Sequence, residues 1–235
     1  MEDKLEIRRE VRRRIKELSM ELRAAAAKEI FTQIEQHEQF KSASCIALFS
    51  SMKDEVATDY ALEAWSAMGK RIVVPRVEGD IMRFYDYSPD TMQEGAFGIM
   101  EPTSNDEITA ENIDLIIVPA RAFTLSGIRL GRGGGFYDKY MSLSGFRAYK
   151  IGIAYTCQIF DTLPHAPHDI KVDEVVFART VAAVHGTNLR YGDVALVHDE
   201  QHVLGEVVQQ AVGWCTRFAT VEVTAVVLYA RAITE

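Results

Sequence analysis

The stretch Ile113-Asp114-Leu115-Ile116-Ile117-Val118-Pro119 decides the fold class of this chain. Its nearly continuous apolar run is typical of a strand that is buried on both faces of a parallel sheet. Further strands are predicted on either side of it, at residues 45–49, 71–75, 149–155 and 172–177. Helical stretches alternate with these strands, and the alternation indicates a three-layer α/β/α fold with a mainly parallel sheet.

Helical periodicity dominates residues 1–40. Apolar residues recur there at spacings of four, four and three, and this stripe consists of Ile7, Val11, Ile15 and Leu18. The stripe predicts an amphipathic helix, and Ser19 is expected to cap a second helix that runs to residue 34. Thr58 is expected to cap a later helix over residues 59–68, which Gly69 ends.

The middle of the chain predicts less regular structure. The strand at residues 71–75 is expected to end in Pro75. Residues 81–87 alternate between apolar and polar side chains, as an edge strand or a hairpin arm does. Residues 88–112 are rich in glycine and proline, which predicts mostly loop.

The C-terminal part differs in character from the rest. Strands are expected at residues 193–198 and 221–229, with an amphipathic helix at 203–214 between them. This segment is too apolar for a disordered linker. We therefore expect a main domain at residues 1–178 and an appended module at 179–235.

Composition limits the class of protein. Of the 235 residues, 48% are hydrophobic, and the formal net charge is −8, which argues against a surface that binds nucleic acid throughout. Cys45, Cys157 and Cys215 are far apart, as expected for buried thiols in a reducing compartment. No apolar run reaches the roughly 20 residues of a membrane span, and the charged N-terminus has no signal core. We expect a cytoplasmic protein, monomeric or weakly homodimeric.

The most informative motif for function is Arg129-Leu130-Gly131-Arg132-Gly133-Gly134-Gly135-Phe136-Tyr137-Asp138. Glycine lets successive backbone N–H groups turn toward an anion. The two arginines add forked donors that suit phosphate oxygens, and Asp138 is a candidate ligand for the Mg²⁺ that accompanies a nucleotide. A plain glycine turn is the alternative, but a turn gains nothing from two arginines. The motif predicts a phosphate-binding loop.

Two well-known phosphate loops do not match this motif. A P-loop needs lysine and then serine or threonine after its second glycine, whereas Gly135 is followed by Phe136 and Tyr137. A dinucleotide fingerprint starting at Gly131 would need glycine where Phe136 stands. The loop is therefore of another kind.

Parallel sheets bind ligands beyond the carboxyl ends of their strands. We therefore expect three loops to meet there, at residues 50–55, 124–137 and 156–173. The helix that begins near Phe136 would direct its positive end, equivalent to about +0.5 charge, at a bound phosphate.

Four segments, taken in order, resemble the 5-formyltetrahydrofolate cyclo-ligases, also called methenyltetrahydrofolate synthetases. They are Lys4-x-x-x-Arg8, Ser51-Met52-Lys53-Asp54-Glu55, the loop from Arg129 to Asp138, and Val172-Asp173-Glu174-Val175. The likeness spans roughly residues 4–178, and the glycine loop with its Phe-Tyr-Asp exit is its most specific part. The resemblance implies ATP-dependent cyclisation of 5-formyltetrahydrofolate to 5,10-methenyltetrahydrofolate, with release of ADP and phosphate.

The resemblance also implies roles for individual residues. The residues implied to contact ATP are Lys4, Arg8, Arg129, Leu130, Gly131, Arg132, Gly133, Gly134, Gly135, Phe136 and Tyr137. Those implied to contact the folate are Ser50, Glu55, Arg132, Gly133, Gly134, Gly135 and Phe136. Asp138 and Asp173 are the implied Mg²⁺ ligands, and Arg132 is the residue expected to act in phosphoryl transfer.

Several alternatives remain open from the sequence. Asp138 could instead pair within its helix, Glu55 could be a solvated loop charge, and Asp173 is expected in an apolar strand, where an unpaired carboxylate is expensive. The family often has lysine where this chain has Gly134, so one charge near the phosphates is missing. A non-catalytic folate- or nucleotide-binding protein on the same fold is the competing function, and an RNA-binding module that uses the basic first helix is a third.

Overall fold

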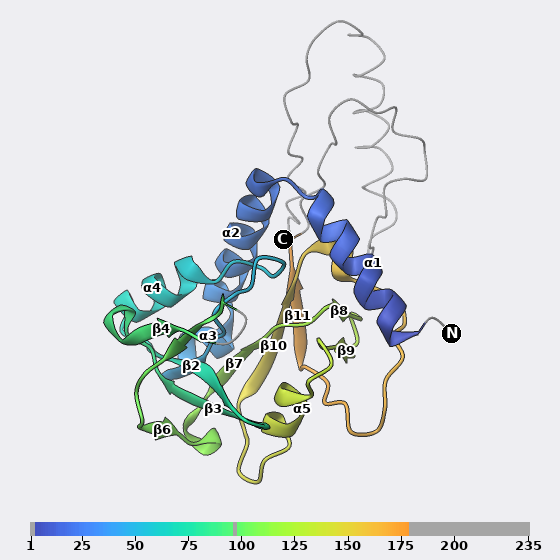
Figure 1. Cartoon of the computed structure of the whole chain (residues 1–235). Helices are drawn as coiled ribbons and strands as arrows, with labels where there is room; N and C mark the ends of the chain where they lie inside the picture. Colours follow the sequence, from blue (N-terminus) through green and yellow to red (C-terminus); the bar gives the residue numbers. More distant parts are fainter. Residues whose placement is uncertain (1–2, 96–97, 179–235) are drawn as a thin grey trace, which may run out of the picture. The chain divides into compact units, whose positions relative to one another are not determined.

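The computed structural model describes residues 3–95 and 98–178 of the chain (Figure 1). The elements predicted at residues 193–198, 203–214 and 221–229 lie outside these residues, as does Cys215. Within the described residues, no helix has the length and apolar character needed to cross a membrane.

A seven-stranded mixed sheet forms the centre, in the order β11-β10-β7-β1-β2-β3-β6. Its strands are β1 (Cys45–Ala47), β2 (Arg71–Glu78), β3 (Ile81–Asp86), β6 (Glu107–Ile108), β7 (Leu115–Val118), β10 (Tyr149–Ala154) and β11 (Glu174–Phe177). The five strands from β11 to β2 run parallel, and β3 and β6 continue the sheet antiparallel. The predicted α/β fold with a mainly parallel sheet is confirmed.

The apolar run at residues 113–119 contains β7, which pairs with β10 on one side and β1 on the other. All four of its residues are buried. Leu115 and Ile117 belong to one core cluster, whereas Ile116 and Val118 belong to another on the opposite face. Because successive side chains of a strand point to opposite faces, this alternation shows that both faces of the sheet are covered.

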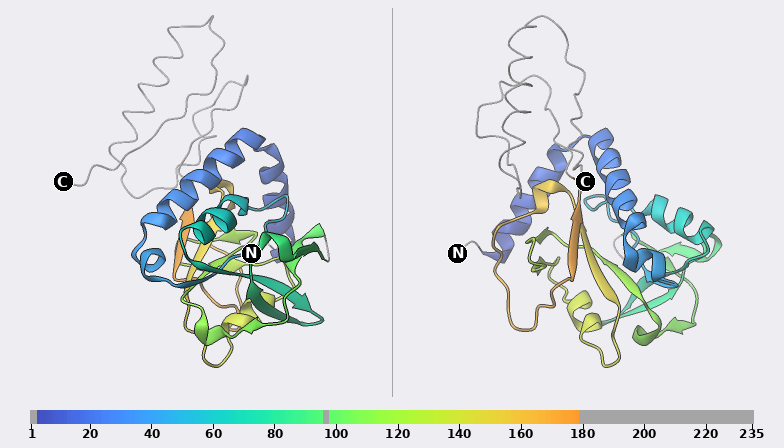
Figure 2. Two further views of the ribbon diagram at one scale, coloured as in Figure 1. Left: turned by 90° about the vertical axis from the view of Figure 1, so that its left-hand side faces the viewer. Right: turned by 180° about the vertical axis from the view of Figure 1, so that it is seen from behind.

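Helices supply the two outer layers. They are α1 (Lys4–Glu17), α2 (Met20–Gln36), α3 (Glu38–Ser42), α4 (Asp59–Ala67) and α5 (Phe136–Met141). Short 3-10 turns also flank strands, among them η1 (Pro89–Thr91), η3 (Ala110–Asn112) and η4 (Thr156–Gln158). Helices α1, α2 and α4 bury their apolar residues in one cluster, and α5 packs in the other, on the far side of the sheet (Figures 1 and 2).

The first two helices form as their sequence predicts. Ile7, Val11 and Ile15 are the buried residues of α1. The Ser19 hydroxyl accepts a hydrogen bond from the backbone N–H of Leu22, so this serine caps α2.

Thr58 does not cap α4, contrary to the prediction. Its hydroxyl instead donates to the Phe49 carbonyl at 2.7 Å and accepts from the Ser51 N–H at 3.1 Å. The hydroxyl is therefore used to close the loop that follows β1, which is one of the three loops expected at the site.

Strand β2 continues three residues past Pro75, so the predicted end of this strand is wrong. Strand β1 pairs with β2 only as far as Val73, and beyond it β2 pairs with β3 alone. Proline is tolerated in such a one-sided stretch because its missing N–H removes no ladder bond from an inner strand. The expected hairpin arm at residues 81–87 is β3.

Several short elements were not expected from the sequence. They include α3, the pair β4 (Met92–Glu94) with β5 (Met100–Pro102), and the pair β8 (Ala122–Phe123) with β9 (Arg129–Leu130). Segments of two or three residues are too short to show a period. The pair β8–β9 matters most, because the glycine loop leaves directly from β9.

Candidate functional site

The glycine loop is held between two fixed elements. Strand β9 ends at Leu130, and α5 begins at Phe136. Gly133 has φ +114° and Gly135 has φ +69°, the left-handed region that side chains with a Cβ rarely adopt. The loop therefore needs glycine at these two positions to connect β9 to α5.

Helix α1 lies against this loop. The Arg8 Nε donates to the Gly131 carbonyl at 2.8 Å, and a Cβ placed on Gly133 would lie 3.8 Å from the Arg8 guanidinium carbon. One helical turn earlier, the Lys4 ammonium pairs with Asp169 at 2.8 Å. The structure thus brings the predicted Lys4-x-x-x-Arg8 pair to the glycine loop and to the segment before β11.

Arg132 connects the glycine loop to the loop after β1. Its Nη2 donates to the Asp54 carboxylate at 2.6 Å, and its Nε donates to the Glu55 carboxylate at 2.8 Å. The side chain of Arg132 keeps 32% of its surface exposed, while that of Glu55 keeps 8%. Arg132 is therefore an oriented cation with one side open to solvent.

Charge pairing sets the protonation of this cluster. Burial alone would raise the pKa of Asp54, but hydrogen bonds from Arg132 and Arg121 outweigh it and lower the pKa. Burial likewise opposes the charge on Arg132, yet Glu55 and Asp54 raise its pKa. Both groups are therefore ionised at neutral pH.

Glu55 is buried and fixed, so the alternative of a solvated loop charge is wrong. Its Oε2 accepts from the Met52 N–H at 2.8 Å, while the Tyr155 hydroxyl donates to its backbone carbonyl at 2.9 Å. Ser50 lies next to this loop, and its Oγ is buried with no hydrogen-bond partner among the described residues. A ligand hydroxyl or amide at this position would satisfy it.

Arg129, Leu130 and Tyr137 lie beneath the loop. The Arg129 side chain is 4% exposed, donates to Asp138 at 2.7 Å and lies 5.7 Å from the centre of the Tyr137 ring. Leu130 is in the core. These residues support the loop from inside. Because the Leu130 side chain is buried, only the backbone of Leu130 could make the predicted ATP contact.

The ring of Phe136 occupies the space beside Gly134. A Cβ placed on Gly134 would lie 2.7 Å from a ring carbon of Phe136. A side chain there would require the ring to turn away. The Phe136 ring can therefore hold this position because residue 134 is glycine and not lysine.

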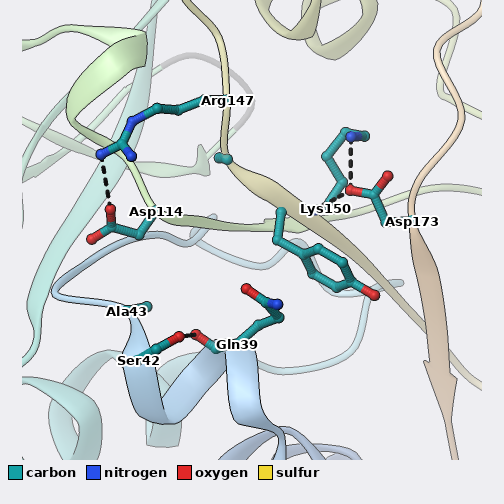
Figure 3. A pocket seen from close by; sticks show the side chains of 9 residues that line it. Gln39, Ser42, Ala43, Asp114, Arg147, Lys150 and Asp173 are labelled. Carbon is teal, nitrogen blue, oxygen red and sulfur yellow. Dashed lines mark hydrogen bonds and ion pairs between the residues drawn. The ribbon is translucent and has the colours of Figure 1, made fainter.

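The two predicted metal ligands have separate partners. Asp138 accepts from Arg129 and from the Ile170 N–H at 3.0 Å. Asp173 pairs with Lys150 at 2.7 Å, beside the pair of Asp114 with Arg147 (Figure 3). Residues 3–95 and 98–178 contain no group of three or more Asp, Glu, His or Cys side chains arranged to hold a metal.

Asp173 lies at the amino edge of the sheet, not in an apolar strand as expected. It directly precedes β11, is exposed and accepts from the Lys150 N–H at the start of β10. The segment from residue 155 to 173 must cross from the carboxyl end of β10 to the amino end of β11, because the two strands are parallel. On its way the segment still contacts α1 and the exit of the glycine loop, because Asp169 pairs with Lys4 and the Ile170 N–H donates to Asp138.

The expected meeting of three loops is otherwise confirmed. Arg132 contacts Asp54 and Glu55, and the Val172 N–H donates to the Gly127 carbonyl at 3.0 Å. Sequence reasoning missed Arg121 as a site residue, although an arginine two residues after Pro119, directly beyond a buried strand, is a signal that could have been used. Asp54 was quoted only as part of a motif.

The fold and the site together define an α/β protein whose arginine-rich site lies beyond the carboxyl ends of a parallel sheet. The chain belongs to the 5-formyltetrahydrofolate cyclo-ligase family, whose model matches residues 1–178. It is therefore a cyclo-ligase, as the sequence resemblance predicted, and membership of this family implies the use of ATP.

Relatives and solved structures agree with this assignment. The chain is 28% identical to the mouse 5-formyltetrahydrofolate cyclo-ligase over 75% of this chain and 94% of that protein. It is 30% identical to the enzyme of the same name from Escherichia coli K12, over 71% and 95%. The NMR structure of Aquifex aeolicus 5,10-methenyltetrahydrofolate synthetase matches with a TM-score of 0.66 and 33% identity, covering 85% of this chain and 98% of that one.

Proposed function

We propose that this chain catalyses the ATP- and Mg²⁺-dependent cyclisation of 5-formyltetrahydrofolate to 5,10-methenyltetrahydrofolate, releasing ADP and phosphate in folate one-carbon metabolism. Family membership supports the reaction class. The observation that supports this proposal is the orientation of Arg132 by Asp54 and Glu55, within a glycine loop that also contacts Arg8.

The proposed chemistry turns a poor leaving group into a good one. The formyl oxygen attacks the γ-phosphorus of ATP, a new O–P bond forms, and the bond to the β-phosphate oxygen breaks to release ADP. N10 then attacks the formyl carbon and closes the five-membered ring. Phosphate departs with the former formyl oxygen, and N10 loses its proton to give the methenyl product.

Phosphoryl transfer needs positioning and charge neutralisation more than covalent participation by the protein. Arg132 would neutralise charge on the transferred group, which is why it is the proposed catalytic residue. Lys4, Arg8 and the backbone from Arg129 to Tyr137 would hold the triphosphate. A single donor of this kind contributes about 3 kcal/mol to the transition state.

The folate would lie on the opposite side of Arg132 from α1. Ser50 has a buried hydroxyl to satisfy, and Glu55 lies beside it with its carboxylate already fixed. Residues Arg132 to Phe136 border both ligands. A pterin carries the N–H donors and carbonyl acceptors that such a polar wall would bind.

Magnesium is usually held by one or two carboxylates together with waters and substrate phosphates. Asp138, at the exit of the glycine loop, fits that mode, because no closed protein cage is needed. Asp173 is the second proposed ligand, and it would have to leave Lys150 to share an ion with Asp138. When bound, Mg²⁺ supplies neutralising charge to the phosphate oxygens.

We further propose a cytoplasmic enzyme, monomeric or weakly homodimeric, that uses neither nucleic acid nor a membrane. Residues 1–178 would form the catalytic domain and residues 179–235 an appended module. Residues 1–178 contain every proposed site residue.

The test is turnover by the purified full chain with 5-formyltetrahydrofolate, ATP and Mg²⁺. We expect methenyl product and ADP in equal amounts, and no product when ATP is omitted. Calorimetry on the same sample measures binding of each ligand. Folded protein that binds both ligands without product would contradict the proposal and support the non-catalytic binding protein.

A further inference from the structure

Arg121 is a buried arginine that the proposed reaction does not yet use. Its side chain is 5% exposed, and it directly precedes β8. Its backbone N–H donates to the Leu130 carbonyl at 2.8 Å, and its carbonyl accepts from the Gln158 side chain at 3.1 Å. The position of Arg121 is therefore fixed to the strand from which the glycine loop leaves.

Gln158 is itself part of this support. It is 2% exposed, and its Nε2 also donates to the Ala120 carbonyl at 3.0 Å, while its Oε1 accepts from the Tyr155 N–H at 2.8 Å. Tyr155 in turn donates to the Glu55 carbonyl. The backbones of residues 120 and 121 are thus tied to Gln158, and that of residue 55 is tied to Tyr155, whose N–H Gln158 also binds.

A guanidinium buried this deeply requires an acidic partner, because an unpaired buried charge is strongly unfavourable. Among the described residues, the acid that pairs with Arg121 is Asp54, through its Oδ2. The other oxygen of the same carboxylate, Oδ1, accepts from Arg132. Asp54 therefore bridges a buried arginine to the open one.

The four side chains form a charge-neutral chain of two cations and two anions. Arg121 binds Asp54, Asp54 binds Arg132, and Arg132 binds Glu55, whose second oxygen accepts from the Met52 N–H. Both ends of this chain of ion pairs are anchored, and the exposed fraction of the side chains increases from Arg121 through Asp54 to Arg132. Such an arrangement leaves Arg132 one orientation that satisfies both carboxylates.

We propose that Arg121 is a positioning residue for Arg132: it holds Asp54 in place, and Asp54 in turn fixes the guanidinium of Arg132 toward the transferred phosphoryl group. This inference rests on the proposed function. Arg121 itself does not touch the reacting atoms. Its contribution is realised in the transition state, where a misplacement of about 1 Å can cost about 100-fold in rate.

The test compares kcat and KM for the full-length wild type with those of Arg121→Met, Arg121→Lys, Asp54→Asn and the double variant Arg121→Met/Asp54→Asn. We expect Arg121→Met to lower kcat about 10- to 100-fold while KM changes less than about threefold. Arg121→Lys, which keeps the charge, should recover most of kcat. Because Arg121 acts through Asp54, the double variant should be no slower than Asp54→Asn alone.

Each other result contradicts the inference. Wild-type kcat in Arg121→Met would do so, as would losses that multiply in the double variant. If Arg121→Lys is as slow as Arg121→Met and both unfold at equally lowered temperatures, the role is structural. If Arg121→Met does not fold, Asp54→Asn serves instead, and normal kcat in that folded variant overturns the inference.

A wild type that binds ligands without turnover would contradict the proposed function separately. The dissociation constant of ATP then becomes the readout, since Arg121→Met changes the cluster from neutral to negative. We expect a several-fold weaker affinity for the anionic triphosphate. Equal affinities in wild type and Arg121→Met would overturn the inference in that case.

Discussion

The two edges of the central sheet both have ion pairs, but they use them differently. At the carboxyl edge, Arg132 pairs with two carboxylates from another loop, of which Glu55 is buried, and 32% of the arginine side chain is exposed. At the amino edge, Arg147 pairs with Asp114 at 3.1 Å with 64% of the arginine side chain exposed (Figure 3). The same residue types are thus more enclosed at the carboxyl edge than at the amino edge.

The difference shows which charges can position a ligand. An exposed pair contributes about 0 to 1 kcal/mol and holds its side chains loosely. A pair with a buried carboxylate such as Glu55 must satisfy its geometry, because leaving a buried charge without its partner costs about 3 to 5 kcal/mol. Arg132 is therefore preorganised for an anion, and Arg147 is not.

The largest expected effect separates these two arginines directly. We predict that Arg132→Ala lowers kcat by about 100- to 1,000-fold, because a donor to the transferred phosphoryl group is lost. Arg147→Ala is the matched control at the amino edge and should keep kcat within about twofold. Steady-state kinetics with ATP and 5-formyltetrahydrofolate measure both, and equal rates in the two variants would remove the distinction between the edges.

A smaller effect tests how the β8–β9 hairpin is held. Gly127, in its turn, has φ +83°, and a Cβ there would lie 2.2 Å from the Val172 carbonyl oxygen. Gly79, in the β2–β3 turn, has φ +63° with no atom within 4 Å of a Cβ. Both substitutions to alanine meet backbone strain of about 1 to 2 kcal/mol, but only Gly127→Ala adds a clash.

We therefore predict that Gly127→Ala lowers the free energy of unfolding by about 3 kcal/mol and Gly79→Ala by about 1 kcal/mol. Denaturant unfolding of the two variants gives the comparison. Equal losses of unfolding free energy would mean that the β8–β9 hairpin does not pack against the segment before β11. This contact would then not support the glycine loop.

The metal predictions concern one carboxylate near the glycine loop and one at the amino edge. Asp138→Asn should raise the Mg²⁺ concentration for half-maximal rate about tenfold or more, because a direct ligand is lost. Calorimetric titration of Mg²⁺ into the protein with ADP supplies a readout besides activity. If only Asp173→Asn shifts the titration, the ion lies at the amino edge instead.

The smallest effect is a pH dependence. Burial would raise the pKa of Asp169, but hydrogen bonds from Lys4 and the Ala166 N–H outweigh it and lower the pKa. A carboxyl group with a lowered pKa stabilises the fold above its ordinary pKa of about 3.8, and that contribution is lost as the pH falls through the folded value.

Asp169→Asn should accordingly destabilise the protein by about 1 to 2 kcal/mol at pH 7. The difference from wild type should shrink below about pH 4. Thermal unfolding between pH 7 and pH 3 tests this, with the exposed Asp161→Asn as control. A constant difference across that range would show that the Lys4–Asp169 pair is not responsible.

Sequence patterns predicted the parts of the molecule that have a period. The apolar run at β7, the stripe of α1 and the cap at Ser19 report local physics, and each is confirmed. The glycine loop was found because φ values above zero demand glycine. The family followed from motifs in order.

What the sequence did not predict depends on contacts across long separations. Arg121 and Asp54 are 67 residues apart in the sequence. Nothing local shows that Arg121 and Arg132 both bind the Asp54 carboxylate. The apolar residues Val172 and 175–177 predict a strand that includes Asp173, whereas β11 begins only at Glu174 and its parallel register places Asp173 at the exposed amino edge. Thr58 was expected to cap a helix, but its hydroxyl donates a tertiary hydrogen bond to the Phe49 carbonyl instead.

The most direct test of the central claim follows one oxygen atom. If the formyl oxygen attacks the γ-phosphorus, ¹⁸O placed in the formyl group of 5-formyltetrahydrofolate must leave in the inorganic phosphate. We predict that mass spectrometry of phosphate from the wild-type reaction finds one ¹⁸O in each molecule released. Unlabelled phosphate, with the label recovered in water, would contradict phosphoryl transfer to the formyl oxygen.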